Sequence, residues 1–233
     1  MSVVFNSKLC INFLSLSLVM IAALNLSAIT LHYNGFLQES VGLSLYNLFY
    51  VDRESNLPNF FNAVLLLLVA ALLFITFLLY KHYRDSAIKY HWLLLSLIFF
   101  FLSVDESVSI HESLTNILPR FGIGGNGYLK FAWVIPYSIA TLLICLFFIR
   151  LLKSLQKPVQ LGFILSGIVY VTGAIGFEMV GAEIAESKGV TNISYALAAS
   201  CEELLEMTGL IIFLHFILKH IRSEFEMVSI TIK

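Results

Sequence analysis

The sequence predicts an all-α membrane protein, a bundle of six transmembrane helices, and three observations predict it. First, 59% of the 233 residues are apolar and only 12% are charged, against roughly 25% charged residues in soluble domains. A soluble fold of this length has too little interior for so many apolar side chains, and disordered chains are poor in them. Second, the apolar residues fall into six windows long enough to cross a bilayer. Third, the basic residues are concentrated on one side of these windows.

Each window is a mostly apolar run near the length of about 20 residues that crosses roughly 30 Å of hydrocarbon. The windows cover residues 11–31, 59–80, 91–112, 129–150, 160–183 and 194–218. Pro58, Pro119 and Pro158 lie in or beside three of the breaks between them. The first window is longer than the apolar region of a signal peptide and lacks a good cleavage site, so we expect a retained helix. A single integral membrane domain, residues 1–233, then fills the chain.

The distribution of Lys and Arg predicts the orientation. If the N-terminus lies in the cytoplasm, six crossings return the C-terminus there. Ten basic residues then lie on the cytoplasmic side: Lys8, Lys81, Arg84, Lys89, Arg150, Lys153, Lys157, Lys219, Arg222 and Lys233. Four lie on the outer side: Arg53, Arg120, Lys130 and Lys188. Cytoplasmic loops carry the excess of basic residues in membrane proteins, so both termini are predicted to be cytoplasmic. The net charge of −1 offers no basic field for nucleic acid, and the predicted partner is the lipid bilayer.

Two segments outside the windows and one proline within them carry further expectations. Residues 32–58 mix apolar side chains with few charges, so we expect an amphipathic helix or lid in the outer interface. The glycine-rich residues 122–127 follow no strand and are expected to form a flexible turn rather than a phosphate loop. Pro136 is expected to remove a hydrogen bond inside the fourth helix and to kink it beside Trp133.

Carboxylates show the opposite bias to the basic residues. Asp85, Glu224 and Glu226 are predicted to be cytoplasmic, and the other acids lie on the outer side. Nine of these fall in three stretches near the outer ends of windows: Asp105, Glu106 and Glu112; Glu178, Glu183 and Glu186; Glu202, Glu203 and Glu206. A helix rises about 1.5 Å per residue, which brings the three stretches to one layer in the outer third of the bilayer. Because no Lys or Arg lies at that depth, bound cations, shared protons or water must offset the charge.

These acids, together with His111, suggest a metal site. On the third predicted helix Asp105 and Glu112 are seven residues apart and share a face, with Glu106 and His111 on opposite sides of it. We expect the direct ligands to be Asp105, Glu106, His111, Glu178, Glu203 and Glu206. Glu202 and Glu112 are expected to support the ligands or to act as general bases. Carboxylates with one imidazole suit hard or borderline divalent ions, and the candidates are Fe, Mn or Zn, with Mg and Ca compatible with the same oxygens.

Three function classes remain open on this evidence. The first is a metal-dependent membrane hydrolase or oxidoreductase whose outward-facing site acts on a lipid or another hydrophobic substrate. The second is a cation or proton transporter or channel, and the third is a structural subunit with a cation-stabilised core. A transporter needs access from both sides, whereas the inner halves of these windows are nearly uncharged and no inverted repeat is evident. The pattern therefore favours an enzyme or a binding site open to one side only. The sequence gives no oligomeric state and no substrate.

Three stretches carry a resemblance to known proteins: residues 105–112 (DESVSIHE), 131–137 (FAWVIPY) and 202–209 (EELLEMTG). Together they resemble an uncharacterised family of polytopic bacterial membrane proteins, which implies a location in the bacterial cytoplasmic (inner) membrane. A looser resemblance connects the chain to alkaline-ceramidase-like membrane hydrolases, which hold zinc with acids and histidines in their spans. The C-terminal histidine pair of that group would correspond here to His215 and His220, which lie on the opposite side from the acids.

Overall fold

The computed structural model describes residues 7–84 and 86–225, and over these residues the protein is built from helices alone. Six helical rods are long and apolar enough to cross a membrane, which agrees with the six predicted windows. They are α1 (Ser7–Tyr33), α3 (Leu57–Tyr83), α4 (Lys89–Val108), α6 (Val134–Ser154), the continuous rod from Lys157 to Lys188, and α9 (Ile193–Glu224). Asp85, Glu226 and Lys233, which entered the prediction of orientation, lie outside the described residues.

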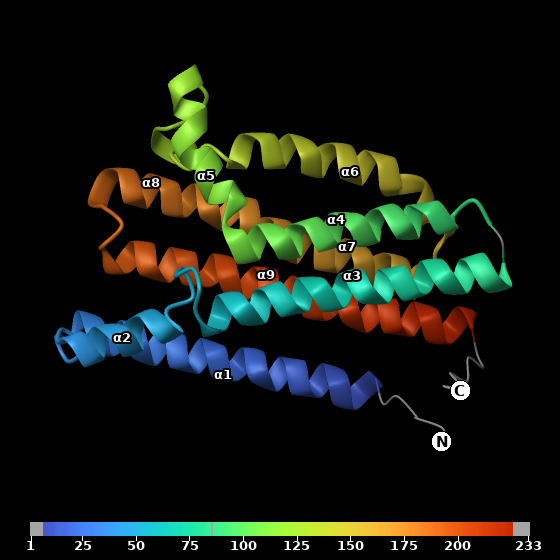
Figure 1. Ribbon diagram of the computed structural model, residues 1–233, viewed down its shortest axis with the longest axis horizontal. Coiled ribbons are helices and arrows are strands. Elements are labelled where there is room, and N and C mark those ends of the chain that lie inside the picture. Colours follow the sequence, from blue (N-terminus) through green and yellow to red (C-terminus); the bar gives the residue numbers. More distant parts are fainter. Residues whose placement is uncertain (1–6, 85, 226–233) are drawn as a thin grey trace.

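The rods lie side by side along the long axis of the molecule (Figure 1). The first residue of α1 and the last residue of α9 are at the same end, as expected for an even number of crossings. The long rod consists of α7 (Lys157–Val171), a π-helical segment (Thr172–Phe177) and α8 (Glu178–Lys188). A π segment adds a residue to the turn and changes which side chains face the neighbouring helix, and such segments often occur at functional sites.

The core of the bundle is formed around α9, which packs against α1, α3 and α7. Its apolar side chains lie against those of α3 and α4, and Leu65, Leu73, Trp92, Met207 and Ile217 are all fully buried. In contrast, α6 leaves large apolar residues such as Leu142 and Leu146 exposed. An aqueous surface would not tolerate so continuous an apolar patch, and a lipid environment accounts for it.

The third predicted window, 91–112, is wrong over its last residues. Helix α4 ends at Val108, and Ser109 adopts the left-handed conformation with φ of 55°. A second short helix, α5 (Ile110–Ile117), then starts in a different direction. His111 and Glu112 therefore do not continue the face of α4, and the predicted arrangement of Asp105 and Glu112 on one helix face does not occur. Helices that end in the left-handed conformation usually carry glycine at that position, so a serine there could not be predicted as a helix end from the sequence.

The fourth predicted window, 129–150, begins too early. Two 3₁₀ turns, Leu118–Phe121 and Gly127–Leu129, precede α6, which starts at Val134. Pro136 consequently lies in the first turn of α6, where backbone N–H groups have no acceptor within the helix. It removes no hydrogen bond from the interior of the helix, so the expected kink at this residue is not formed.

The segments predicted outside the windows contain the expected helix and the expected turn. Residues 32–58 contain α2 (Ser40–Phe49), which packs on the end of α1 through the stacked rings of His32, Tyr46 and Tyr50. Its other side exposes apolar residues, among them Val41 and Leu45. The glycine-rich loop turns through four residues with positive φ: Gly122, Gly124, Gly125 and Gly127. Both segments lie at the same end of the bundle as α5 (Figure 1).

Candidate metal centre

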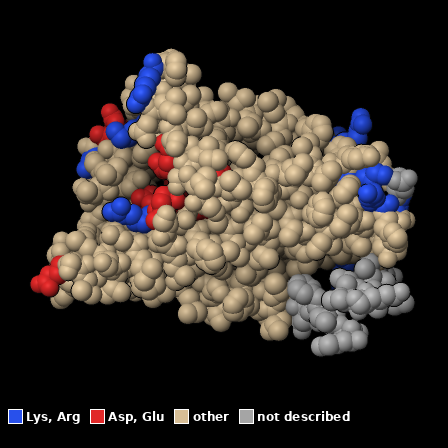
Figure 2. Space-filling view, in the orientation of Figure 1, with Lys and Arg blue, Asp and Glu red and all other residues tan. Residues whose placement is uncertain are grey.

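The acids meet in a polar cavity at the end of the bundle that carries α2 and α5. Figure 2 shows Asp and Glu residues, in red, gathered in a hollow near this end. The cavity has a volume of about 40 Å³, which is room for a few water molecules or a hydrated ion. It is lined by Val51, Asp52, Arg53, Glu54, Asn59, His111, Glu112, Phe131, Trp133, Glu178, Tyr195, Glu202 and Glu203.

His111 is held by Asp105, which is 3% exposed. One oxygen of Asp105, Oδ1, accepts hydrogen bonds from the His111 backbone N–H at 2.9 Å and from ring Nδ1 at 3.1 Å. The other oxygen, Oδ2, accepts from the Tyr137 hydroxyl at 2.6 Å. Both oxygens of Asp105 are therefore engaged within the protein. The contact fixes the imidazole with Nδ1 protonated and leaves Nε2 free, which is the arrangement by which carboxylates orient histidine ligands of metals.

The charge around His111 stabilises its protonated form when no ion is bound. Burial acts against the imidazolium, but the hydrogen bond to Asp105 and the nearby carboxylates outweigh it and raise the pKa of His111 to about 9. The ring also packs edge-on against Trp133, with 5.0 Å between the ring centroids. The imidazole therefore occupies a strongly negative environment in which a cation of either kind, a proton or a metal ion, is favoured.

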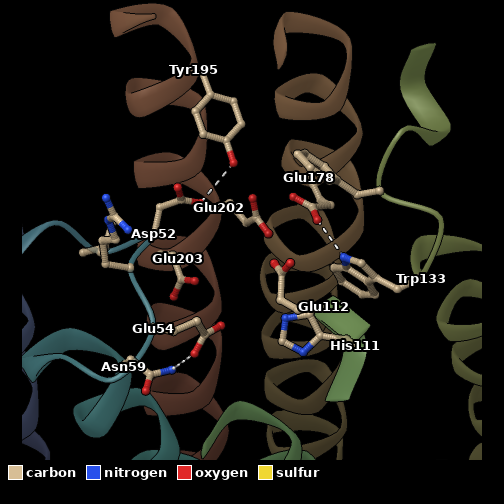
Figure 3. Close-up of a pocket in the computed structure, with 13 residues that line it drawn as sticks. Asp52, Glu54, Asn59, His111, Glu112, Trp133, Glu178, Tyr195, Glu202 and Glu203 are labelled. Atoms are coloured by element: carbon tan, nitrogen blue, oxygen red, sulfur yellow. Dashed lines mark hydrogen bonds between the residues drawn. The ribbon is translucent and has the colours of Figure 1, made fainter. Parts of the chain in front are cut away.

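Glu54 and Glu112 bring carboxylate oxygens to the same place. One ligand atom from each of Glu54, His111 and Glu112 lies within 4.8 Å of the other two, close enough for one ion to contact all three. The three side chains converge in Figure 3. Glu54 is positioned by Asn59, whose amide Nδ2 donates to its Oε2 at 3.1 Å. Among the described residues, these three are the group of His, Cys, Asp or Glu side chains whose ligand atoms all lie within 4.8 Å of one another.

Carboxylates of the long rod and of α9 form the wall opposite this trio. Trp133 Nε1 donates a hydrogen bond to Glu178 Oε1 at 2.7 Å, which fixes the Glu178 carboxylate. Glu202 points toward Glu178 across the gap between the two helices (Figure 3). Both side chains are buried, whereas Glu203, one residue further along α9, has one buried oxygen, Oε2, without a hydrogen-bond partner.

The close approach of these two helices depends on Gly173 in the π segment. A Cβ atom at this position would lie 2.6 Å from the backbone oxygen of Glu202 and 3.1 Å from the backbone nitrogen of Glu206. Only glycine permits that contact between backbones. This close contact lies one turn before Glu178.

Two further predicted ligands lie behind the cavity. Glu106 accepts hydrogen bonds from Asn59 Nδ2 at its backbone oxygen and at Oε1, both at 3.0 Å. Glu206 is buried on α9, and Asn62 of α3 lies beside both carboxyl groups. The same amide of Asn59 thus connects Glu106 with Glu54 at the cavity.

At the mouth of the cavity Asp52 accepts a hydrogen bond from the Tyr195 hydroxyl at 3.3 Å. Burial raises the pKa of Asp52 to about 7, against the opposing effect of its hydrogen bonds. Arg53 also lines the cavity, and its guanidinium makes no hydrogen bond or ion pair with any part of the chain that the structure describes. Burial likewise raises the pKa of Glu54 above its usual value.

The structure thus separates the predicted ligands into two layers. His111, Glu178 and Glu203 line the cavity together with Glu112 and Glu202, while Asp105, Glu106 and Glu206 lie behind it. Asp105 serves to orient His111. Sequence reasoning missed Glu54, which lies in a loop and not in a window. The available signal was its position, three residues before the outer end of the second rod at Leu57. Which of these residues bind an ion stays a prediction.

Comparison with known proteins adds one family. The model of a family described as "Domain of unknown function (DUF8692)" matches residues 13–221. No curated protein and no solved structure matches the chain.

Proposed function

The chain belongs to the DUF8692 family, and we propose that it is a metal-dependent membrane hydrolase acting on a lipid or another hydrophobic substrate. The observation that carries this proposal is the trio Glu54, His111 and Glu112 at ligand distance, with His111 oriented from behind by Asp105. A single imidazole with two carboxylates suits Mn, Fe or Zn, and all three ions activate water in hydrolytic enzymes. A hydrolase needs only water as co-reactant, whereas an oxidoreductase would need an electron source.

In this proposal, Glu54, His111 and Glu112 would hold the ion, which would supply Lewis acidity that makes a water in the cavity easier to deprotonate. Glu202 is the proposed general base, because its carboxyl group lines the cavity beside Glu178, whose Oε1 accepts a hydrogen bond from Trp133. Glu202 takes one proton of the water, and the resulting hydroxide attacks the carbonyl carbon of an ester or amide. The bond to the leaving group then breaks, and Glu202 returns the proton to the leaving oxygen or nitrogen. Water is consumed and no electron is transferred.

The position of the cavity supports a hydrophobic substrate. Figures 1 and 2 share one view, in which the helices run across the page. The hollow that holds the acids opens toward the viewer in Figure 2, so the acids are reached from the side of the bundle, near its end. Val51, Phe131 and Trp133 provide apolar and aromatic surface at the lining. A substrate dissolved in the bilayer could approach along this route with its polar group leading.

The packing beneath the cavity argues against the transporter and channel alternatives. One turn beyond Glu206 on α9, Leu210 is 1% exposed, and Leu214 and Ile217 continue the same buried apolar core. A cation crossing from the cavity to the opposite end would meet this core without any charged residue to carry it. A transporter that opens alternately to the two sides would require α9, the central helix of the bundle, to separate from α3 and α7.

We further propose that the cavity faces outward from the bacterial cytoplasmic membrane with both termini in the cytoplasm. The ten-to-four distribution of basic residues in the sequence supports this orientation. A reporter that fluoresces only in the cytoplasm, fused after Lys233, should be active, and one that requires export should be inactive. The reverse result would place the cavity on the cytoplasmic side.

The proposed function is tested by metal content and hydrolysis together. The protein purified in detergent should carry Mn, Fe or Zn, and His111→Ala should lose that ion and the hydrolysis of long-chain acyl esters and amides presented in vesicles. Glu39→Gln is the matched control, because Glu39 is an exposed acid outside the cavity. Wild-type protein without bound metal after reconstitution with each ion would overturn the proposal.

A further inference from the structure

We infer that Asn25, a residue of α1 outside the cavity, positions the loop that carries Glu54 and so keeps the proposed metal trio assembled. The ligand loop, residues 50–56, connects α2 to α3 and brings Asp52, Arg53 and Glu54 to the cavity. The role of Glu54 as a ligand rests on the proposed function, whereas the hold of Asn25 on the loop can be measured without any metal. Asn25 is a positioning residue, because it acts through Glu54 and does not line the cavity.

Asn25 joins the ligand loop to α9. Its Oδ1 accepts a hydrogen bond from the backbone N–H of Val51 at 3.2 Å, and its Nδ2 donates to Ser200 Oγ at 2.9 Å. The Ser200 hydroxyl donates in turn to the backbone oxygen of Ala196 at 2.6 Å. Asn25, Val51 and Ser200 are all buried. One side chain thus fixes the start of the loop to the helix that carries Glu202, two residues beyond Ser200.

The direction of its hydrogen bonds distinguishes Asn25 from other polar residues of α1. Ser17, Ser27 and Thr30 are exposed, and their hydroxyls donate to backbone oxygens four residues earlier in the same helix. Asn25 is 2% exposed and makes both of its hydrogen bonds outside α1. A polar side chain inside a membrane span is costly, and such residues are usually functional. The pairing of Asn25 indicates that its function is to join the loop to α9.

The second half of the ligand loop is held from α3. Asn56, which caps α3, donates from Nδ2 to the backbone oxygen of Tyr50 at 2.7 Å. Asn59 Oδ1 accepts from the backbone N–H of Ser55 at 3.3 Å, and Asn59 Nδ2 donates to Glu54 Oε2 at 3.1 Å. Ser55 has φ of 58°, a left-handed conformation that is costly for residues other than glycine. Glu54 therefore lies in a turn that needs support from both sides, and α1 supplies it at the start of the loop.

Loss of the Asn25 amide is expected to open the loop. Val51 is 2% exposed, so its backbone N–H would be left buried without a partner, which is costly. The first half of the loop would then move toward water and take Glu54 with it. A carboxylate gathered from a mobile loop binds an ion less tightly than one that is already in place. His111 would remain where it is, because Asp105 holds it independently of the loop.

Hydrogen exchange tests the hold on the loop without reference to metal. Amide exchange of residues 50–56 is followed by mass spectrometry in metal-free protein in detergent. We expect exchange roughly 10-fold faster in Asn25→Leu than in wild type, since loss of a buried hydrogen bond shifts a local opening by about that factor. Leucine is close to asparagine in size and suits a membrane span, so this variant should fold. Exchange of the loop at the wild-type rate would overturn the inference.

Ser96→Ala is the matched control for the lost hydrogen bond. The buried Ser96 hydroxyl donates to the Ala70 backbone oxygen at 2.8 Å, between α4 and α3 and outside the cavity lining. This variant should leave exchange of residues 50–56 unchanged. If Asn25→Leu instead speeds exchange equally over all the helices, it destabilises the bundle as a whole, and the specific hold on the loop is wrong.

Metal affinity tests whether the hold reaches the proposed site. Asn25→Leu should lower the affinity for Mn²⁺ roughly 10-fold or more, and Ser96→Ala should leave it at the wild-type value. The double variant Asn25→Leu with Glu54→Gln should bind Mn²⁺ no more weakly than Glu54→Gln alone, because Asn25 acts through Glu54. An affinity unchanged by Asn25→Leu, or a further loss in the double variant, would overturn positioning through Glu54.

The inference and the proposed function fail separately in these experiments. If wild type binds no metal but Asn25→Leu speeds exchange of the loop, Asn25 positions the loop and the proposed function is wrong. If wild type binds Mn²⁺ but Asn25→Leu changes neither the loop nor the affinity, the proposed site stands and the inference is wrong.

Discussion

His111 and Asp105 are joined twice, through the backbone N–H and through ring Nδ1 of the histidine, both to the same carboxylate oxygen. This contact is possible because α4 ends at Val108 and Ser109 reverses the chain before α5 begins. In a continuous helix the two side chains, six residues apart, would point to different sides. The histidine is therefore oriented by its own local chain, independently of how the long helices pack.

Asp105→Asn is expected to weaken metal binding without removing a ligand. The amide keeps the shape of the side chain but loses the negative charge of the carboxylate. That charge holds Nδ1–H of His111 and makes Nε2 a stronger ligand for a metal ion. Loss of such a supporting carboxylate costs roughly 10- to 100-fold in metal affinity. Isothermal titration with Mn²⁺ or Zn²⁺ measures the change. Asp52→Asn changes an acid of the same cavity without touching His111, so it should lower the affinity for metal less than Asp105→Asn does. Equal losses in the two variants would mean that only the net charge matters.

Ser109→Val is expected to destabilise the protein and to displace His111. A β-branched residue with φ of 55° is strained by about 1–2 kcal/mol relative to glycine. Ser109→Gly should be neutral or slightly stabilising, since glycine adopts this conformation freely. Thermal unfolding in detergent should give Ser109→Gly a melting temperature equal to or above that of wild type, and Ser109→Val the lowest of the three. Ser113→Val, on the exposed face of α5, is the control for a β-branched residue in helical conformation; it loses only the 3.3 Å hydrogen bond from Ser113 Oγ to the Ser109 backbone oxygen and should change the melting temperature little. A Ser109→Val variant as stable as wild type would show that the chain can leave the left-handed conformation at no cost.

The sequence was sufficient for the fold because membrane spans are encoded by composition over long windows. Six apolar runs of bilayer length leave few alternatives once solubility is excluded. The same reasoning located the acids in one layer, since depth follows from the helix rise alone. His111, Glu178, Glu202 and Glu203 do meet at one cavity as that argument requires.

The details of the site could not be predicted because they depend on irregular backbone. The break at Ser109 occurs in the run Ser107-Val108-Ser109-Ile110, which contains neither glycine nor proline. Glu54 enters the cavity because the loop before α3 folds back over the helix ends, which is a property of tertiary packing. The orientation of the bundle in the membrane is predicted from the distribution of Lys and Arg alone, and it stays a prediction.

Gly173→Ala is expected to destabilise the bundle at the acid layer. The added methyl group would lie 2.6 Å from the Glu202 backbone oxygen and 3.0 Å from Leu205 Cβ, so α9 must move away from the π segment. Overpacking of this kind costs about 1–3 kcal/mol. Gly167→Ala is the matched control, because a Cβ there meets nothing within 4 Å and alanine favours the helix. Thermal unfolding in detergent compares the two variants. Similar melting temperatures would show that the two helices can separate without cost.

Glu202→Gln is expected to abolish turnover while leaving the ion in place. Glutamine keeps the size of the side chain but cannot accept the proton of the water, and loss of a general base lowers the rate roughly 10²- to 10⁴-fold. Because Glu202 is outside the trio of Glu54, His111 and Glu112, metal content should equal that of wild type. The assay is kcat for long-chain ester or amide hydrolysis, with bound metal measured on the same sample. Glu183→Gln, on the same side of the molecule but outside the cavity lining, should retain full activity. If Glu202→Gln instead loses the metal and the activity together, Glu202 is a ligand, and the proton must be taken by another carboxylate of the cavity.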